Sequence, residues 1–82
     1  MTTHLALLCG INVSGHNMIK MEVLKTTLEA VGFKNVQTYI QSGNVFVDTE
    51  EENPAKVGFI IKQEIFKTLG LEVPVVVIRK SD

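Results

Sequence analysis

The sequence has little cysteine and no concentration of charge of one sign. Cys9 is the single cysteine among 82 residues, so the chain can form no internal disulfide, no structural zinc site built from several thiolates and no four-thiolate iron–sulfur cluster. No cofactor is predicted. The 8 basic and 9 acidic residues are dispersed, and the formal net charge is −1. Without a basic stripe to neutralise phosphates, neither nucleic acid nor an anionic membrane is expected as a partner.

Long hydrophobic runs and low-complexity linkers are also lacking. The apolar run that begins at Leu5 is far too short to cross a bilayer, and the first four residues lack the basic start of a signal peptide. A cytoplasmic protein is therefore expected. No linker divides the chain, so residues 1–82 are expected to form one domain. Hydrophobic residues make up 45% of it, which is enough for a packed core.

The spacing of apolar residues predicts four strands and two helices. The strands are expected over residues 3–9, 36–40, 45–48 and 73–78. Residues 21–31 and 54–69 carry apolar side chains every three or four positions, as amphipathic helices do. Gly32 and Gly70 predict left-handed helix ends, and Asn53 followed by Pro54 predicts a capped helix start. Pro74 indicates that the last strand is an edge strand, or at least that it starts where no backbone donor is needed.

This β-α-β-β-α-β order favours a ferredoxin-like α+β fold. Such a fold is a two-layer sandwich with both helices on one face of an antiparallel sheet of strand order 4-1-3-2. The unbroken apolar run from Leu5 predicts that the first strand is central and buried on both faces. Cys9 is then expected to be a small core residue, and Met18 and Met21 are expected to be packing residues.

The topology brings two polar loops to one end of the sheet. Because the first and third strands are expected to be antiparallel neighbours, the loop over residues 10–17 and the turn over residues 41–44 emerge together. Their amide, hydroxyl, imidazole and glycine backbone groups suit a small polar or anionic ligand. The candidate rim consists of Gly10, Asn12, Ser14, Gly15, His16, Asn17, Gln41, Ser42, Gly43 and Asn44. Ordinary turns use the same residue types, so a purely structural role is the alternative.

Two segments resemble a known family. Residues 8–17 (LCGINVSGHN) and 38–45 (TYIQSGNV) are similar, in order and separation, to the two motifs of the domain-of-unknown-function family 1697. The resemblance implies a cytoplasmic bacterial protein and the amino-terminal half of a longer chain, and it implies no reaction. Cys9 stands where the family pattern usually has arginine, and Ser14 where it usually has glycine. Any anion-binding role implied by the family is correspondingly weaker here.

A binding or assembly half-domain is the function that the sequence favours. Apolar residues alternate onto both sides of the first and last strands, so some must remain on the face away from the helices, where Tyr39 and Phe46 can join them. The expected partner over that face is the carboxy-terminal half of a longer protein or a second copy in a two-fold dimer.

Two other classes of function stay open. An acylphosphatase-like anion-binding hydrolase could use the 10–17 loop, but the single arginine, Arg79, lies on another strand and His16 has no carboxylate near it in the sequence. An RNA-binding module shares the expected topology, although the first strand carries no aromatic side chain for base stacking.

Overall fold

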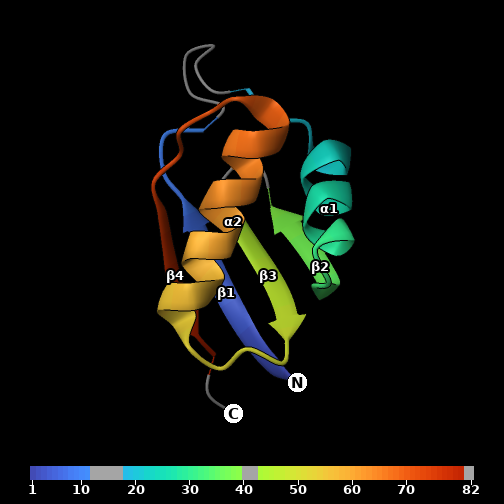
Figure 1. Ribbon diagram of the computed structural model, residues 1–82, viewed down its shortest axis with the longest axis vertical. Coiled ribbons are helices and arrows are strands. Elements are labelled where there is room, and N and C mark those ends of the chain that lie inside the picture. Colours follow the sequence, from blue (N-terminus) through green and yellow to red (C-terminus); the bar gives the residue numbers. More distant parts are fainter. Residues whose placement is uncertain (12–17, 40–42, 81–82) are drawn as a thin grey trace.

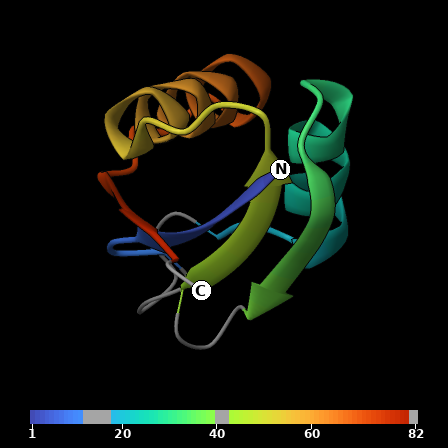
Figure 2. The same cartoon turned by 90° about the horizontal axis from the view of Figure 1, so that it is seen from below.

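The computed structural model describes residues 1–11, 18–39 and 43–80. Its elements are β1 (Thr2–Leu8), α1 (Met21–Ala30), β2 (Lys34–Tyr39), β3 (Asn44–Thr49), α2 (Pro54–Leu69) and β4 (Val75–Arg79). The strands form one antiparallel sheet in the order β2-β3-β1-β4, which is the predicted order read from the other edge. Both helices cover the same face of this sheet (Figures 1 and 2).

The helix ends form where the sequence predicts them. Asn53 caps α2, because its Oδ1 accepts a hydrogen bond from the backbone N–H of Ala55. Gly70 ends the same helix with a φ of 70°. Gly32 follows α1 with a φ of 105°, and Phe33 then packs into the core. These local signals therefore fix where each helix turns back towards the sheet.

The core lies between the sheet and the two helices. The sheet contributes the inward side chains of β1 and β3, and the helices contribute their predicted apolar stripes. Fully buried members include Ala6, Val45, Val47, Leu24, Leu28, Val57, Ile61 and Ile65. At Gly58, α2 approaches β4 closely, since a Cβ at this position would lie 3.2 Å from Cγ2 of Val77. A side chain at this position would require Val77 to shift by a few tenths of an ångström.

Three predicted burials are wrong. β1 is central, but it alternates, and Leu5 and Leu7 point away from the helices and are only half-buried. Cys9 shares the phase of these two residues and lies just past the end of the strand, so its side chain is exposed. Met18 is also exposed, whereas Met21 packs against the core as predicted. The apolar run from Leu5 therefore indicates a central strand, but it does not indicate that both faces of that strand are buried.

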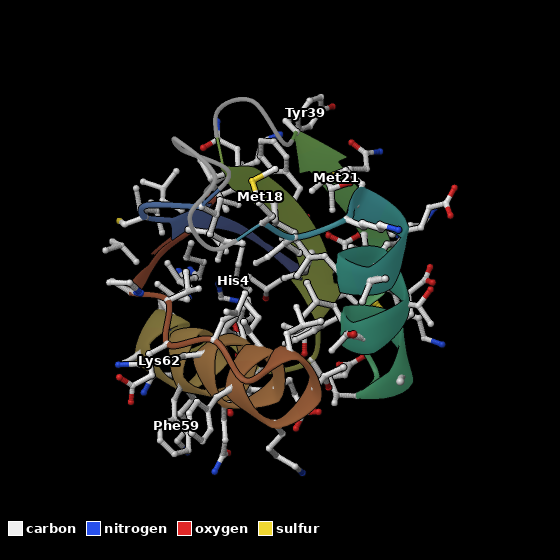
Figure 3. The ribbon with its side chains drawn as sticks, turned by 90° about the horizontal axis from the view of Figure 1, so that it is seen from above. His4, Met18, Met21, Tyr39, Phe59 and Lys62 are labelled. Atoms are coloured by element: carbon white, nitrogen blue, oxygen red, sulfur yellow. The ribbon has the colours of Figure 1, made fainter. Side chains whose placement is uncertain are left out.

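His4 is a buried polar residue at the start of β1, lying between the sheet and α2 (Figure 3). Its Nε2 is 2.8 Å from the carbonyl oxygen of Glu51. A carbonyl can only accept, so Nε2 carries the proton and donates. Nδ1 has no hydrogen-bond partner within the described part of the chain. The bond ties the connector between β3 and α2 to the central strand.

Both edges of the sheet are short or irregular. The pairing of β2 with β3 shifts in register between Lys34 and Gln37, and within that interval Asn35 has a φ of 50°. Asparagine tolerates this left-handed conformation better than most residues. At the other edge, β4 has five residues and follows Pro74, so the predicted edge strand is confirmed.

Candidate functional site

The two loops of the predicted rim begin at the same end of the sheet. The Leu8 N–H donates to the carbonyl oxygen of Gly43 at 2.8 Å, so the end of β1 meets the start of β3. Of the rim residues, Gly10 is exposed, Gly43 is buried and Asn44 is half-buried. The other members, Asn12, Ser14, Gly15, His16, Asn17, Gln41 and Ser42, lie outside the described residues. The strand ends are adjacent as expected, while the rim itself stays a prediction.

The face of the sheet away from the helices carries two kinds of side chain. We call it the helix-free face, and the strand registers place its outward residues in rows across the sheet. One row contains Ile78, Leu5, Phe46 and Gln37, and the next contains Val76, Leu7, Asn44 and Tyr39. Apolar side chains therefore gather over β4 and β1, and aromatic and polar ones gather over β3 and β2. Val76, Ile78 and Tyr39 are each 52% exposed.

A groove of about 380 Å³ lies over the β3 and β2 side of this face. Its lining consists of Thr3, Asn35, Gln37, Tyr39, Phe46, Asp48 and Lys80. The rings of Tyr39 and Phe46 meet edge to face, with centroids 6.0 Å apart and an interplanar angle of 88°. The Lys80 Nζ lies 5.8 Å from the centroid of Phe46, within cation–π distance. The groove thus combines an aromatic corner with polar and charged groups.

Two neighbouring strands fix the carboxylate of Asp48 in this groove. The Thr3 Oγ1 donates to its Oδ1, and the Asn35 Nδ2 donates to its Oδ2 at 2.8 Å. These hydrogen bonds, that of Thr3 foremost, hold the pKa of Asp48 below its usual range, with a smaller contribution from the charge of Lys80. The carboxylate is therefore oriented, and it is charged at neutral pH.

Replacing Asp48 by asparagine is expected to change how stability depends on pH. A carboxyl group whose pKa is lowered by folding stabilises the protein above its unfolded pKa, near 3.8, and this stabilisation is lost as the pH falls through the lower folded pKa. Urea unfolding of the wild type and Asp48→Asn should therefore show the larger difference at neutral pH and a smaller one near pH 2. A difference that is the same at both pH values would contradict this.

Arg79 does not lie near the end of β1, which the 10–17 loop follows in the sequence. It pairs with His4 near the start of β1, whereas Gly10 follows the end of that strand. Its Nη1 is 4.0 Å from a carboxylate oxygen of Glu52. The guanidinium of Arg79 is therefore at the opposite end of β1 from Gly10.

Neither a metal site nor a membrane-spanning helix is found among the described residues. No three histidine, cysteine, aspartate or glutamate side chains among them are grouped as metal ligands would be. Neither described helix is long and apolar enough to cross a membrane.

The fold is an α+β arrangement of one four-stranded antiparallel sheet and two helices. The chain belongs to the family described as protein of unknown function (DUF1697), whose model matches residues 1–82, the whole chain. The resemblance drawn from segments 8–17 and 38–45 is thereby confirmed.

The chain is also similar to a solved structure, that of the conserved bacterial protein SP0830 from Streptococcus pneumoniae. The TM-score is 0.70 and the sequence identity is 26%, over 95% of this chain and 43% of that one. The chain thus spans less than half the length of this relative. A comparison with the curated proteins finds no match.

Proposed function

We propose that this chain is a binding and assembly half-domain of ferredoxin-like layout whose partner covers the helix-free face. The observation that carries the proposal is the set of apolar side chains over β1 and β4, namely Leu5, Leu7, Val76 and Ile78. Full burial of such a side chain is worth about 1.5–3 kcal/mol relative to full exposure, and covering these partly exposed ones would gain part of that. A contiguous apolar patch on a folded domain is a common mark of an interface.

In longer relatives, the occupant we propose is the carboxy-terminal half of the same polypeptide. Length supports this choice, because the matched part is only 43% of the SP0830 chain. A second domain that is joined by a linker is present at a high effective concentration, so even a modest apolar patch is sufficient to hold it on the face. In the 82-residue chain alone, a second copy would take that place in a two-fold dimer.

The expected dimer of the isolated chain is weak and can be tested by sedimentation. Four strands at about 4.8 Å spacing and five residues at about 3.3 Å give a face of roughly 19 by 17 Å, or about 320 Å². This area is small beside the roughly 800 Å² that each partner of a stable complex buries. The wild type should pass from monomer to dimer between about 10 μM and about 1 mM. Ile78→Lys, which places a charge on the face, should remain monomeric.

Phe59→Lys is the matched control, because Phe59 is exposed on the outer side of α2, away from the sheet (Figure 3). This variant should dimerise like the wild type. A wild-type chain that stays strictly monomeric at the highest concentration, or an Ile78→Lys variant that dimerises unchanged, would overturn the proposed interface.

The predicted rim is a second part of the proposal, as a site for a small polar or anionic ligand at the end of the sheet. The hydrogen bond between Leu8 and Gly43 supports it, since it joins the end of β1, which one loop follows, to the start of β3, which the other loop precedes. An acylphosphatase-like reaction is the weaker alternative because Arg79 is at the far end of β1. We also propose a bacterial cytoplasmic setting, which the family resemblance implies.

A further inference from the structure

The groove over β3 and β2 has the parts that a nucleobase site needs. Phe46 offers an aromatic face on a central strand, Tyr39 closes one side of it, and Asp48 supplies a fixed anion. We infer that this groove binds the base of a nucleotide, a planar nitrogen heterocycle with N–H donors on its edge. The inference does not rest on the proposed interface over β1 and β4.

The spacing along β3 suits a stacked base. Phe46 and Asp48 are two residues apart on the same face of one strand, which corresponds to roughly 6.6 Å. A base that stacks on the Phe46 ring has its edge displaced towards Asp48, and a hydrogen bond of about 2.9 Å spans the remaining gap. The volume of about 380 Å³ lies within the range of small-molecule pockets.

The chemistry of Asp48 selects which base edge fits. A charged carboxylate only accepts hydrogen bonds, so it favours an edge that donates. Its two oxygens each accept one bond, from Thr3 and from Asn35, and each retains a further lone pair. Guanine presents a ring N–H beside an exocyclic amine and can therefore donate to both oxygens, as a guanidinium does. Bases without the amine donate to one oxygen at most.

Lys80 already shows that the Phe46 ring can take a partner on its face, since its ammonium lies over that ring. The lysine side chain is long and exposed. Stacking of a base on an aromatic ring is stronger than a cation–π contact at an exposed site, so a base would displace it. The displaced ammonium remains beside the groove, where it suits the phosphate of a nucleotide.

Amide NMR titration of this chain with guanosine, inosine and uridine monophosphates is the direct test. Guanosine monophosphate should shift the amides of Gln37, Phe46 and Asp48 to saturation, and inosine monophosphate, which lacks the amine, should bind about fivefold or more weakly. Phe46→Leu and Asp48→Asn should each weaken guanosine monophosphate binding by about tenfold. Phe59→Leu, the same substitution at an exposed phenylalanine on α2, should leave it unchanged.

A titration with a guanine-containing single-stranded oligoribonucleotide distinguishes RNA from free nucleotides as the source of the base. Binding tighter than that of the free nucleotide assigns the groove to RNA, and weaker binding assigns it to free nucleotides. Thermal unfolding of each variant verifies that it is folded. Folding is expected to survive these substitutions because Phe46 and Asp48 are only half-buried.

Three results would overturn the inference. Shifts that never saturate, or that are equal for all three nucleotides, would show that no base is selected. Binding that Phe46→Leu and Phe59→Leu reduce equally would show that the groove is not the site. Shifts confined to Gly10, Gly43 and Asn44 with both nucleotide and inorganic phosphate would place binding at the rim instead. A dimer over the whole helix-free face would cover the groove, so the titrations are made in the Ile78→Lys background, which is expected to remain monomeric. Base binding and the proposed interface are then tested separately.

Discussion

Replacing Gly43 by alanine is expected to lower the free energy of unfolding by about 3 kcal/mol, a large part of the stability of a small domain. Gly43 has a φ of 69°, a conformation that costs an alanine about 1–2 kcal/mol. In addition, a Cβ at this position would lie only 2.6 Å from the carbonyl oxygen of Leu8. That oxygen belongs to the backbone of the central strand, so it cannot move aside as a flexible side chain would.

Gly10→Ala is the matched control for Gly43→Ala. Gly10 has nearly the same φ, 70°, but a Cβ there would meet nothing within 4 Å. Only the conformational penalty of about 1–2 kcal/mol applies. Urea unfolding of both variants measures the two costs side by side. Equal losses would contradict the close approach between the start of β3 and the end of β1.

Replacing His4 by alanine is expected to destabilise the protein by about 3 kcal/mol. The imidazole is wholly buried, so its loss leaves a cavity in the core. Its Nε2–H also donates a hydrogen bond to the carbonyl oxygen of Glu51, and the substitution would remove this donor. Chemical unfolding measures the total effect, and amide exchange near Glu51 reports whether the connector between β3 and α2 has loosened.

His4→Leu separates the two causes. Leucine fills much of the same space and removes Nδ1, which has no partner among the described residues, but it donates no hydrogen bond to Glu51. The expected loss is about 1 kcal/mol. A loss as large as that of His4→Ala would mean that the hydrogen bond, and not the packing, dominates at this position.

The order of elements and the strand order followed from local signals in the sequence. Helix ends depend on neighbouring residues alone, and Asn53, Gly32 and Gly70 each provide a capping preference that the structure uses. Two right-handed crossovers and a central hairpin then leave few ways to order four strands. These arguments do not depend on how the side chains pack.

The faces of β1 were harder to predict. Leu5 and Leu7 are as apolar as Ala6 and Leu8, so hydrophobicity alone gives no contrast between the covered side and the open side. The sequence consequently predicts a buried Cys9, whereas Cys9 follows Leu5 and Leu7 in phase and is exposed. The burial of His4 was also hard to predict, because a histidine is polar and its hydrogen-bond partner is a carbonyl 47 residues away in the sequence.

The groove around Asp48 could not be predicted because its lining depends on the register of the strands. Thr3 is 45 residues from Asp48, and Asn35 reaches the carboxylate through a left-handed backbone at the irregular part of β2. Lys80 comes from the end of the described chain. Tyr39 and Phe46 were expected on this face, and the structure brings their rings into contact.

The irregular edge of β2 limits how many copies of this protein can join. A regular edge strand offers a row of unpaired backbone groups on which further strands add, and repeated addition gives a filament. The register shift between Lys34 and Gln37 interrupts that row, and β4 offers only five residues after Pro74 at the other edge. The proposed association over the helix-free face would instead close after two copies. In that arrangement the protein would keep an apolar surface available without forming filaments.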